Sequence, residues 1–419
     1  MTRGGSAALL VVAVGVFLGC WTLLHHGTLA RAQLTDTGTY SGYGDQIARG
    51  AVPYRDFRLE YPPGALPMFV LPALGHEGDQ PAFDRWFERL MALCGALAIV
   101  GAALALRALG AGAMRSTAAL GLMAVSPLLL GSVVLTRFDL WPVALVAFGV
   151  AALFWERFAA AAVLLGLAIA AKLWPAVLAP LAIVWIARTR GPRAAAAWAA
   201  GVVVVDAACF LPFAVLSPAG LGASFHAQLA RPLQLESLGG AVLIAVHHVF
   251  GTGLRVVSSF GSQNPSGSGV HELGVASTVA TVVAVVTVWA LFARGPATVE
   301  RLAAYSAAAV AALLAFGKVF SPQYLLWLVA LVPLVRGRRG VVAGSVYALA
   351  LGLTQSWFPR HYWALAIRLA PTQSWLLLGR DLAVVVLLGV LAWPGTERDL
   401  HGHGHGHGRA RLAALERMR

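Results

Sequence analysis

The chain has 419 residues, of which 59% are apolar and only 12% are charged, whereas soluble domains are roughly 45 to 50% apolar. Its 31 basic and 18 acidic residues are too few to solvate a water-soluble surface of this size, which excludes a cytosolic enzyme, a disordered scaffold and a secreted disulfide module. The formal net charge of +13 is typical of arginines in the short loops of a membrane protein. We therefore expect a lipid bilayer, and no nucleic acid, as a partner.

Apolar runs along the chain predict an all-α polytopic membrane protein with roughly 12 transmembrane helices. The first run, 7–24, is interpreted as an uncleaved span because no clean small-residue cleavage site follows it. The other runs lie at about 89–107, 116–134, 140–154, 158–171, 174–187, 194–215, 274–293, 302–317, 322–335, 341–355 and 377–393. As one helix, 158–187 would be about 45 Å long, more than a hydrocarbon core of about 30 Å, so we expect a hairpin of two short helices interrupted at Lys172 and Pro175.

The arginines between these runs predict the orientation in the cell membrane, because loops rich in arginine face the cytoplasm. With both termini cytoplasmic, the clusters at 188–193 and 336–339 lie inside. The long segments 25–88, 216–273 and 356–376 then lie on the outer face. Their apolar stretches 64–74 and 241–250 are too short to span, so we expect them to lie in the interface or to re-enter.

The chain is interpreted as a membrane domain at 1–395 followed by a cytoplasmic tail at 396–419, rich in His, Gly and Arg. Alternating His and Gly at 401–408 could bind a transition metal loosely, but this pattern is more typical of a low-complexity tail.

Carboxylates are concentrated in the first outer segment, which holds eight of the 18 acidic residues. If the chain after Asp36 is helical, Asp36, Tyr40 and Tyr43 share one face and Asp36 occupies the N-cap. One interpretation is that Asp36 only caps this helix. The other is that Asp36 is a general base, which takes a proton from a sugar hydroxyl as that hydroxyl attacks an activated carbon. Asp56 and Glu60 in the same loop are the alternatives for this role.

Cations at the outer ends of short helices form a second group. Lys172 and Lys318 are the only lysines among the 31 basic residues, and each either snorkels toward water or pairs with an anion in a cavity. Arg137 lies at a similar depth and either pairs with Asp139 or contributes to the same cavity. Three separate cations at one membrane depth would suit the phosphate of a lipid-linked substrate.

Short motifs occur in a characteristic order between the spans: Pro-Tyr-Arg-Asp-Phe and Glu-Tyr-Pro-Pro in the first outer loop, then Arg-Phe-Asp-Leu-Trp-Pro, Lys-Leu-Trp-Pro and Lys-Val-Phe-Ser-Pro-Gln-Tyr. Over about 30–335, this order resembles the polytopic glycosyltransferases of the GT-C superfamily, and within them glycosyltransferase family 87, which includes polyprenol-phosphate-mannose-dependent mannosyltransferases.

The resemblance implies a GT-C-like helical bundle with outer-face loops, short interfacial helices and an outer cavity. It implies transfer of a hexose, with mannose as the leading candidate, from a polyprenyl-phosphate-linked donor to a glycan or glycolipid acceptor, with inversion. Asp36 would be the base, with Asp56 and Glu60 as alternatives. The implied donor-phosphate and substrate-binding residues are Arg137, Asp139, Lys172, Lys318, Gln323, Tyr324, Tyr40, Tyr54 and Tyr61. We expect no cofactor and no metal ligand set.

Two other functional classes fit a polytopic chain with intramembrane charges. A transporter or lipid flippase commonly has repeated halves and a site at the midplane, whereas here no matching halves are evident and the charged and aromatic motifs collect on the outer side. The other class is a non-catalytic assembly subunit. The sugar and the acceptor are not identified by the sequence.

Overall fold

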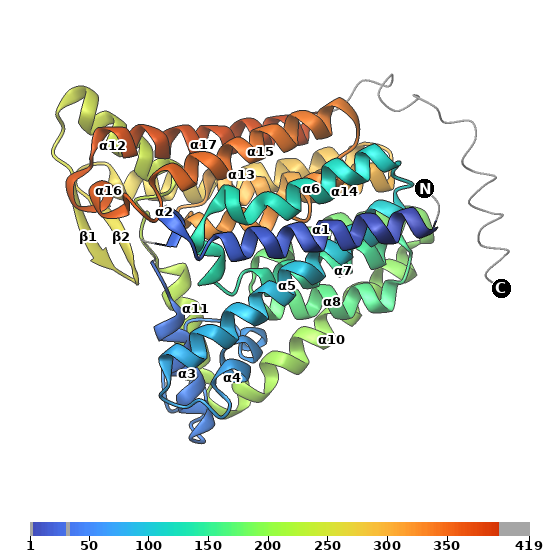
Figure 1. The fold of residues 1–419 in the computed structure, drawn as a ribbon, viewed down its shortest axis with the longest axis horizontal. Coiled ribbons are helices and arrows are strands. Elements are labelled where there is room, and N and C mark those ends of the chain that lie inside the picture. Colours follow the sequence, from blue (N-terminus) through green and yellow to red (C-terminus); the bar gives the residue numbers. More distant parts are fainter. Residues whose placement is uncertain (1–2, 31–33, 394–419) are drawn as a thin grey trace.

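The computed structural model describes residues 3–30 and 34–393, so the tail expected at 396–419 lies outside the described residues. Within this part of the chain, the fold is a bundle of α-helices with a single two-stranded hairpin, which confirms the expected all-α polytopic architecture (Figure 1). The helices long and apolar enough to cross a membrane are α1 (Arg3–Leu23), α5 (Gln80–Ala108), α6 (Ala113–Leu130), α10 (Pro192–Leu216), α13 (Val270–Arg294), α14 (Val299–Phe316) and α17 (Pro371–Ala392). The bent pair α15 (Gly337–Trp357) and α16 (Tyr362–Arg368), which meet at 72°, could form one further span.

The described residues thus give seven or eight spans by length and apolarity, in place of the roughly 12 expected from hydropathy. Several apolar runs form helices that are shorter than a typical membrane span: α7 (Leu140–Phe154), α8 (Phe158–Ala171) and α9 (Ala179–Arg190). The run at 322–335 forms the short 3₁₀ helices η4 (Pro322–Leu328) and η5 (Val332–Leu334). Most side chains of α7 are buried, because it packs between α5 and α8. A helix that is apolar on all sides can therefore be covered by protein instead of lipid.

The break expected within 158–187 is present. Helix α8 ends at Ala171, Lys172 has an extended backbone, and the 3₁₀ helix η3 (Trp174–Leu178) leads into α9. Proline at the second position of η3 fits this turn, because proline has no N–H to donate to a continuing helix.

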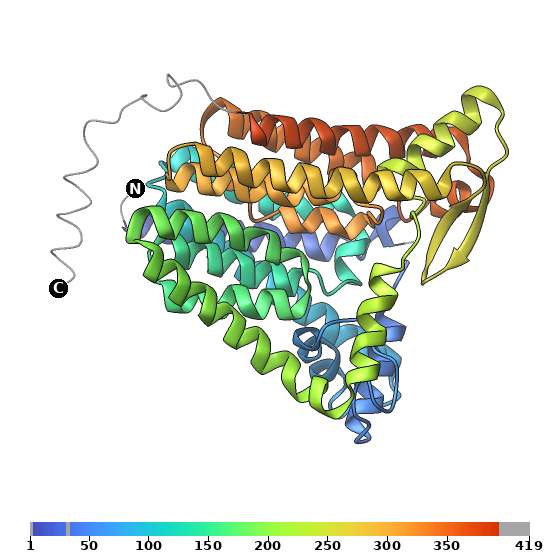
Figure 2. The ribbon, with the colours of Figure 1, turned by 180° about the vertical axis from the view of Figure 1, so that it is seen from behind.

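The three segments expected on the outer face lie together at one end of the molecule, away from the N-terminus (Figure 1). They contain α2 (Gly27–Ala30), α3 (Thr37–Ala48), η1 (Pro63–Ala65), α4 (Pro67–Ala73), α11 (Pro218–Leu229), α12 (Leu238–Phe250), α16 and the antiparallel strands β1 (Arg255–Ser259) and β2 (Ser262–Ser266). Seen from behind, α10 crosses the bundle obliquely and leads into α11 (Figure 2). The fold thus gathers three distant parts of the sequence at one end.

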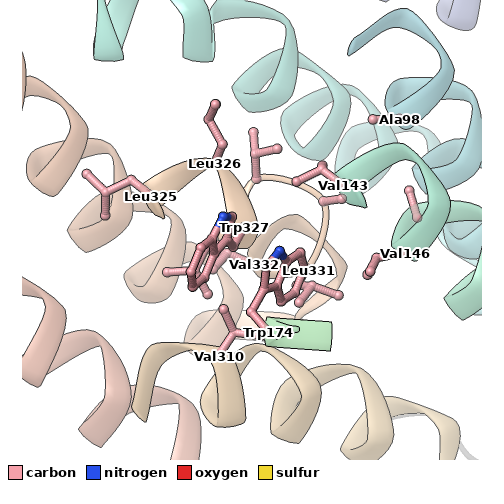
Figure 3. Packing of buried hydrophobic residues seen from close by; sticks show 14 of the residues in the cluster. Ala98, Val143, Val146, Trp174, Val310, Leu325, Leu326, Trp327, Leu331 and Val332 are labelled. Carbon is pink, nitrogen blue, oxygen red and sulfur yellow. The ribbon is translucent and has the colours of Figure 1, made fainter. Parts of the chain in front are cut away.

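Two stacked indoles lie in the core beneath this end. The rings of Trp174 and Trp327 are 5.3 Å apart between centroids and inclined by only 6°. Apolar side chains from α7 and α14, including Val143 and Val310, surround them (Figure 3). This packing fixes η3 and η4 against each other. It thereby also fixes the residues that flank these two 3₁₀ helices.

Candidate functional site

A cavity of about 500 Å³ opens among the gathered segments. Its wall comes from the start of α3, the loop before η1, the chain just after η2 (Ser132–Leu135), the start of η3, α11 and the segment after it, the tip of the β-hairpin, η4 and α16. Among the residues expected from the sequence, those that line it are Asp36, Tyr40, Tyr54, Glu60, Tyr61, Arg137, Lys172, Gln323 and Tyr324.

Asp36 stands at the N-cap of α3, but its carboxylate does not cap the helix. Its backbone carbonyl accepts from the amides of Thr39 and Tyr40, whereas the cap position shows no side-chain hydrogen bond. The hydroxyl of Thr35 accepts from the amide of Thr37 instead. The Asp36 carboxylate forms an ion pair with Arg137 on the cavity wall. The interpretation that Asp36 serves only as a cap is therefore wrong.

Asp139 forms a buried pair with Lys172. Its Oδ1 accepts from Lys172 Nζ at 2.7 Å and from the indole of Trp327 at 2.6 Å, and the residue is 1% exposed. The ammonium also lies over the rings of Phe138 and Tyr324, at 4.8 and 5.1 Å from their centroids. Lys172 does not snorkel into water. Its partner is an anion of the protein itself.

The charges therefore pair across the cavity wall instead of along the chain. A pair of Arg137 with Asp139, one of the two alternatives from the sequence, is not formed; Asp36 pairs with Arg137 and Lys172 pairs with Asp139. Arg137 is 8% exposed, and burial lowers its pKa to about 10, which still leaves it charged at neutral pH. Each carboxylate is thereby held beside one cation.

Two of the predicted tyrosines, Tyr40 and Tyr61, belong to a buried aromatic cluster that joins the first outer segment to the bundle. The ring of Tyr40 stacks on Phe69 at 4.8 Å and meets the edge of Phe138 at 5.7 Å between centroids. The hydroxyl of Tyr54 donates to the carbonyl of Tyr61 at 2.6 Å. Burial raises the pKa of Tyr40 well above its usual range, so its hydroxyl stays neutral.

Close backbone packing holds the same segment on the end of α8. A Cβ at Gly64 would lie 2.5 Å from the carbonyl carbon of Ala170, and the indole of Trp141 donates to the Gly64 carbonyl at 3.0 Å. Glycine is therefore required where the loop passes next to Lys172.

Three predicted site residues do not line the cavity. Asp139 lies behind the wall. Asp56 is exposed and paired with Arg55, which together with the amide of Val52 lowers the pKa of Asp56 to about 2. Lys318 Nζ donates to the carbonyl of Leu229 at 2.7 Å. Of the two alternative bases, only Glu60 faces the cavity.

A third carboxyl group of the lining, Glu236, was not predicted from the sequence. It is 3% exposed, Tyr362 hydrogen bonds to it, and its Oε2 has no partner among the described residues. Burial raises its pKa to about 7. The guanidinium of Arg380 donates to its backbone carbonyl at 2.6 Å. One feature of the sequence could have indicated it: Glu236 is the only acidic residue between Asp206 and Glu272.

The lining combines carboxyl groups, cations and aromatic rings, a set that can bind a sugar and accept a proton from a hydroxyl. Among residues 3–30 and 34–393, no group of three or more His, Cys, Asp or Glu side chains is arranged to hold a metal ion.

A family model described as glycosyltransferase family 87 matches residues 59–322, which is more than half of the chain. The matched region contains Glu60, Arg137, Lys172 and Glu236, whereas Asp36 precedes it. No curated protein matches the chain.

Proposed function

Because this chain belongs to glycosyltransferase family 87 and is therefore a glycosyltransferase, we propose that it transfers mannose from a polyprenyl-phosphate-linked donor to a glycan or glycolipid acceptor. The reaction takes place on the extracytoplasmic side of the plasma membrane and inverts the anomeric carbon. The membership favours an enzyme over the transporter and the assembly subunit. The choice of mannose and of the donor lipid is supported by the resemblance of the motifs.

The observation that carries the proposal is the Asp36 carboxylate, which lines the cavity, is not used as a cap and is held by Arg137. In the reaction, the acceptor oxygen forms a bond to the anomeric carbon from the face opposite the phosphate. The bond from that carbon to the phosphate oxygen breaks, and its electron pair leaves with the phosphate. The acceptor proton passes to Asp36.

Other lining residues have supporting roles in this proposal. Tyr61 and Tyr324 line the cavity and place aromatic rings next to a bound pyranose. Arg137 and Lys172 hold the charges of Asp36 and Asp139 in place and face the sugar. Since each is already paired with a carboxylate, neither offers an unbalanced positive charge to the donor phosphate.

Transfer of radiolabelled mannose from the polyprenyl-phosphate donor by purified protein, with an extract of membrane glycolipids as acceptor, tests the proposal. Asp36→Asn keeps the size of the side chain but removes its basicity, so turnover should fall about 10²- to 10⁴-fold. Asp56→Asn, which alters an exposed carboxylate outside the cavity, is the matched control and should retain turnover close to the wild-type value.

Glu60→Gln separates the two carboxylates of the same loop that reach the cavity. Near-normal transfer by Asp36→Asn, with transfer lost in Glu60→Gln, would move the base to Glu60. Absence of transfer by the wild-type protein from this donor, but transfer from a nucleotide sugar, would reject the donor class.

A further inference from the structure

Glu236 contributes a carboxyl group to the cavity wall that the proposed reaction does not use. The residue lines the cavity and is only 3% exposed. Its Oε2 is buried and has no hydrogen-bond partner among residues 3–30 and 34–393. Buried polar atoms in folded proteins are nearly always hydrogen bonded, because leaving one without a partner is costly. The free oxygen therefore marks a place where a bound molecule completes the hydrogen bonding.

The chain around Glu236 is held from three sides. The amide of Gln234 donates to a carbonyl in the segment between α14 and η4 at 2.8 Å, and the amide of Leu235 donates to the carbonyl of Gln263 in β2 at 3.0 Å. The guanidinium of Arg380 in α17 donates to the carbonyl of Glu236 at 2.6 Å. These contacts fix the backbone of Glu236 relative to the cavity before a ligand binds.

Arg380 is an unusual support for one carbonyl, because it is a fully buried charge. Its Nε lies 2.7 Å from Asp381 Oδ1, and its guanidinium lies over the ring of Phe320 at 3.8 Å from the centroid. A buried ion pair contributes little net stability, because its desolvation offsets much of its attraction. Its use here favours a role in positioning, since side chains that bind a substrate need a rigid supporting shell.

The polar groups next to Glu236 are not available to its free oxygen. Gln234 also lines the cavity, but its Oε1 accepts from the amide of Phe320 at 2.9 Å and its Nε2 donates to the hydroxyl of Ser321 at 3.2 Å. Arg231 is the third cation of the lining, and within the described ranges it forms no ion pair with Glu236. A carboxylate repels a phosphate, whereas a hydroxyl group can donate to a carboxylate or accept from a carboxylic acid. The chemistry of this position therefore fits a hydroxyl group.

We propose that Glu236 binds one hydroxyl group of the transferred sugar through Oε2 and thereby helps to select which sugar is transferred. The assignment rests on the proposed function, which places the donor sugar in this cavity. A site built around a hydroxyl group rejects the analogue that lacks it, because the polar group of the protein then stays buried and unpaired.

The test is kcat/KM of the purified protein for polyprenyl-phosphate donors that carry mannose or one of its four monodeoxy analogues. In the wild type, one analogue should be transferred at least about 100-fold less efficiently than mannose. Glu236→Ala should lower the transfer of mannose by a similar factor and transfer that analogue as well as mannose, because the hydroxyl group has lost its partner. Glu236→Gln keeps an oxygen that can accept and should retain part of the selectivity. Comparison of the two proteins cancels the intrinsic reactivity of each analogue.

Glu272→Gln, which alters an exposed carboxylate of α13 outside the lining, is the matched control and should treat all five donors like the wild type. Wild-type protein that transfers sugar from none of the donors would reject the proposed function. Wild-type transfer that does not discriminate among the donors, or an equal loss for all five in both Glu236 variants, would reject the hydroxyl site alone. Selectivity for deoxy analogues of the acceptor that disappears in Glu236→Ala would place the bound hydroxyl group on the acceptor and overturn the proposal.

Discussion

Lys172→Met should destabilise the protein, because it leaves Asp139 buried without its cation. Asp139 is 1% exposed and the side chain of Lys172 is 15% exposed, so the Asp139 carboxylate cannot be solvated in place and the Lys172 ammonium only in part. Breaking a buried ion pair by removal of one partner costs about 3 to 5 kcal/mol. Because Lys172 keeps some contact with water, we expect about 3 kcal/mol. Asp139→Asn should cost a similar amount, since an amide oxygen still accepts from Trp327 but leaves Lys172 unpaired.

The double variant with Lys172→Met and Asp139→Asn should be close to the wild type, because no unpaired charge remains. Free energies of unfolding from reversible denaturation in mixed detergent micelles, combined as a double-mutant cycle, give the coupling energy directly. We expect a coupling of about 6 kcal/mol in magnitude, because the two single losses of about 3 kcal/mol each disappear in the double variant. Additive single effects would refute the buried pair.

Donor binding by the stable double variant answers a separate question. If Lys172 holds only Asp139, the double variant retains affinity for the donor. A stable double variant that binds donor more than about tenfold more weakly would show that Lys172 also contacts the substrate, as the sequence motif predicts.

Three further results are expected. In a cysteine-free background, Gly42→Cys should react with an impermeant thiol reagent in intact cells, whereas Gly112→Cys should react only after lysis. Both positions have open space for a side chain, and the arginine pattern puts them on opposite sides of the membrane. The reverse labelling pattern would invert the topology. The free energy of unfolding should fall by up to about 3 kcal/mol as the pH rises from about 5 to 8, because the folded protein retains a proton on Glu236 up to its pKa of about 7 while the unfolded chain has already released it. Glu236→Gln should reduce the slope by this contribution in a thermal or chemical denaturation series, and an unchanged slope would exclude Glu236 as a source. Gly64→Ala should lower the same free energy by about 1 to 3 kcal/mol through collision with the backbone of Ala170, whereas Gly42→Ala, in open space, should be tolerated.

The residues of the cavity were predictable where charge is rare in the sequence. Asp36, Arg137 and Lys172 stand out as charged residues beside apolar runs, and all three line the cavity. Their partners were not predictable, because Arg137 and Asp139 are two residues apart and yet each pairs with a residue far away in the sequence. The direction in which a side chain points at a turn depends on the packing around it, and the spacing of residues in the sequence does not determine that packing.

Other features depend on contacts between distant segments. Glu236 and Arg231 belong to no motif, and they reach the cavity because hydrogen bonds join their segment to the chain after α14. Hydropathy does not distinguish α7 from a lipid-facing helix, because α7 is equally apolar although α5 and α8 cover it. By contrast, the alternation of spans and loops was enough to predict that the three outer segments lie at the same end of the molecule.

The distribution of the cavity residues along the chain has a consequence for biosynthesis. Asp36 leaves the ribosome well before Tyr362, which hydrogen bonds to Glu236. Chains are made from the N-terminus, so the first outer loop emerges long before the segments that complete the wall around it. A nascent chain that has not yet reached α16 therefore contains Asp36 but lacks part of the cavity wall. Competence for sugar transfer should arise late and abruptly, when α16 joins the assembly, and no shorter nascent chain should carry it.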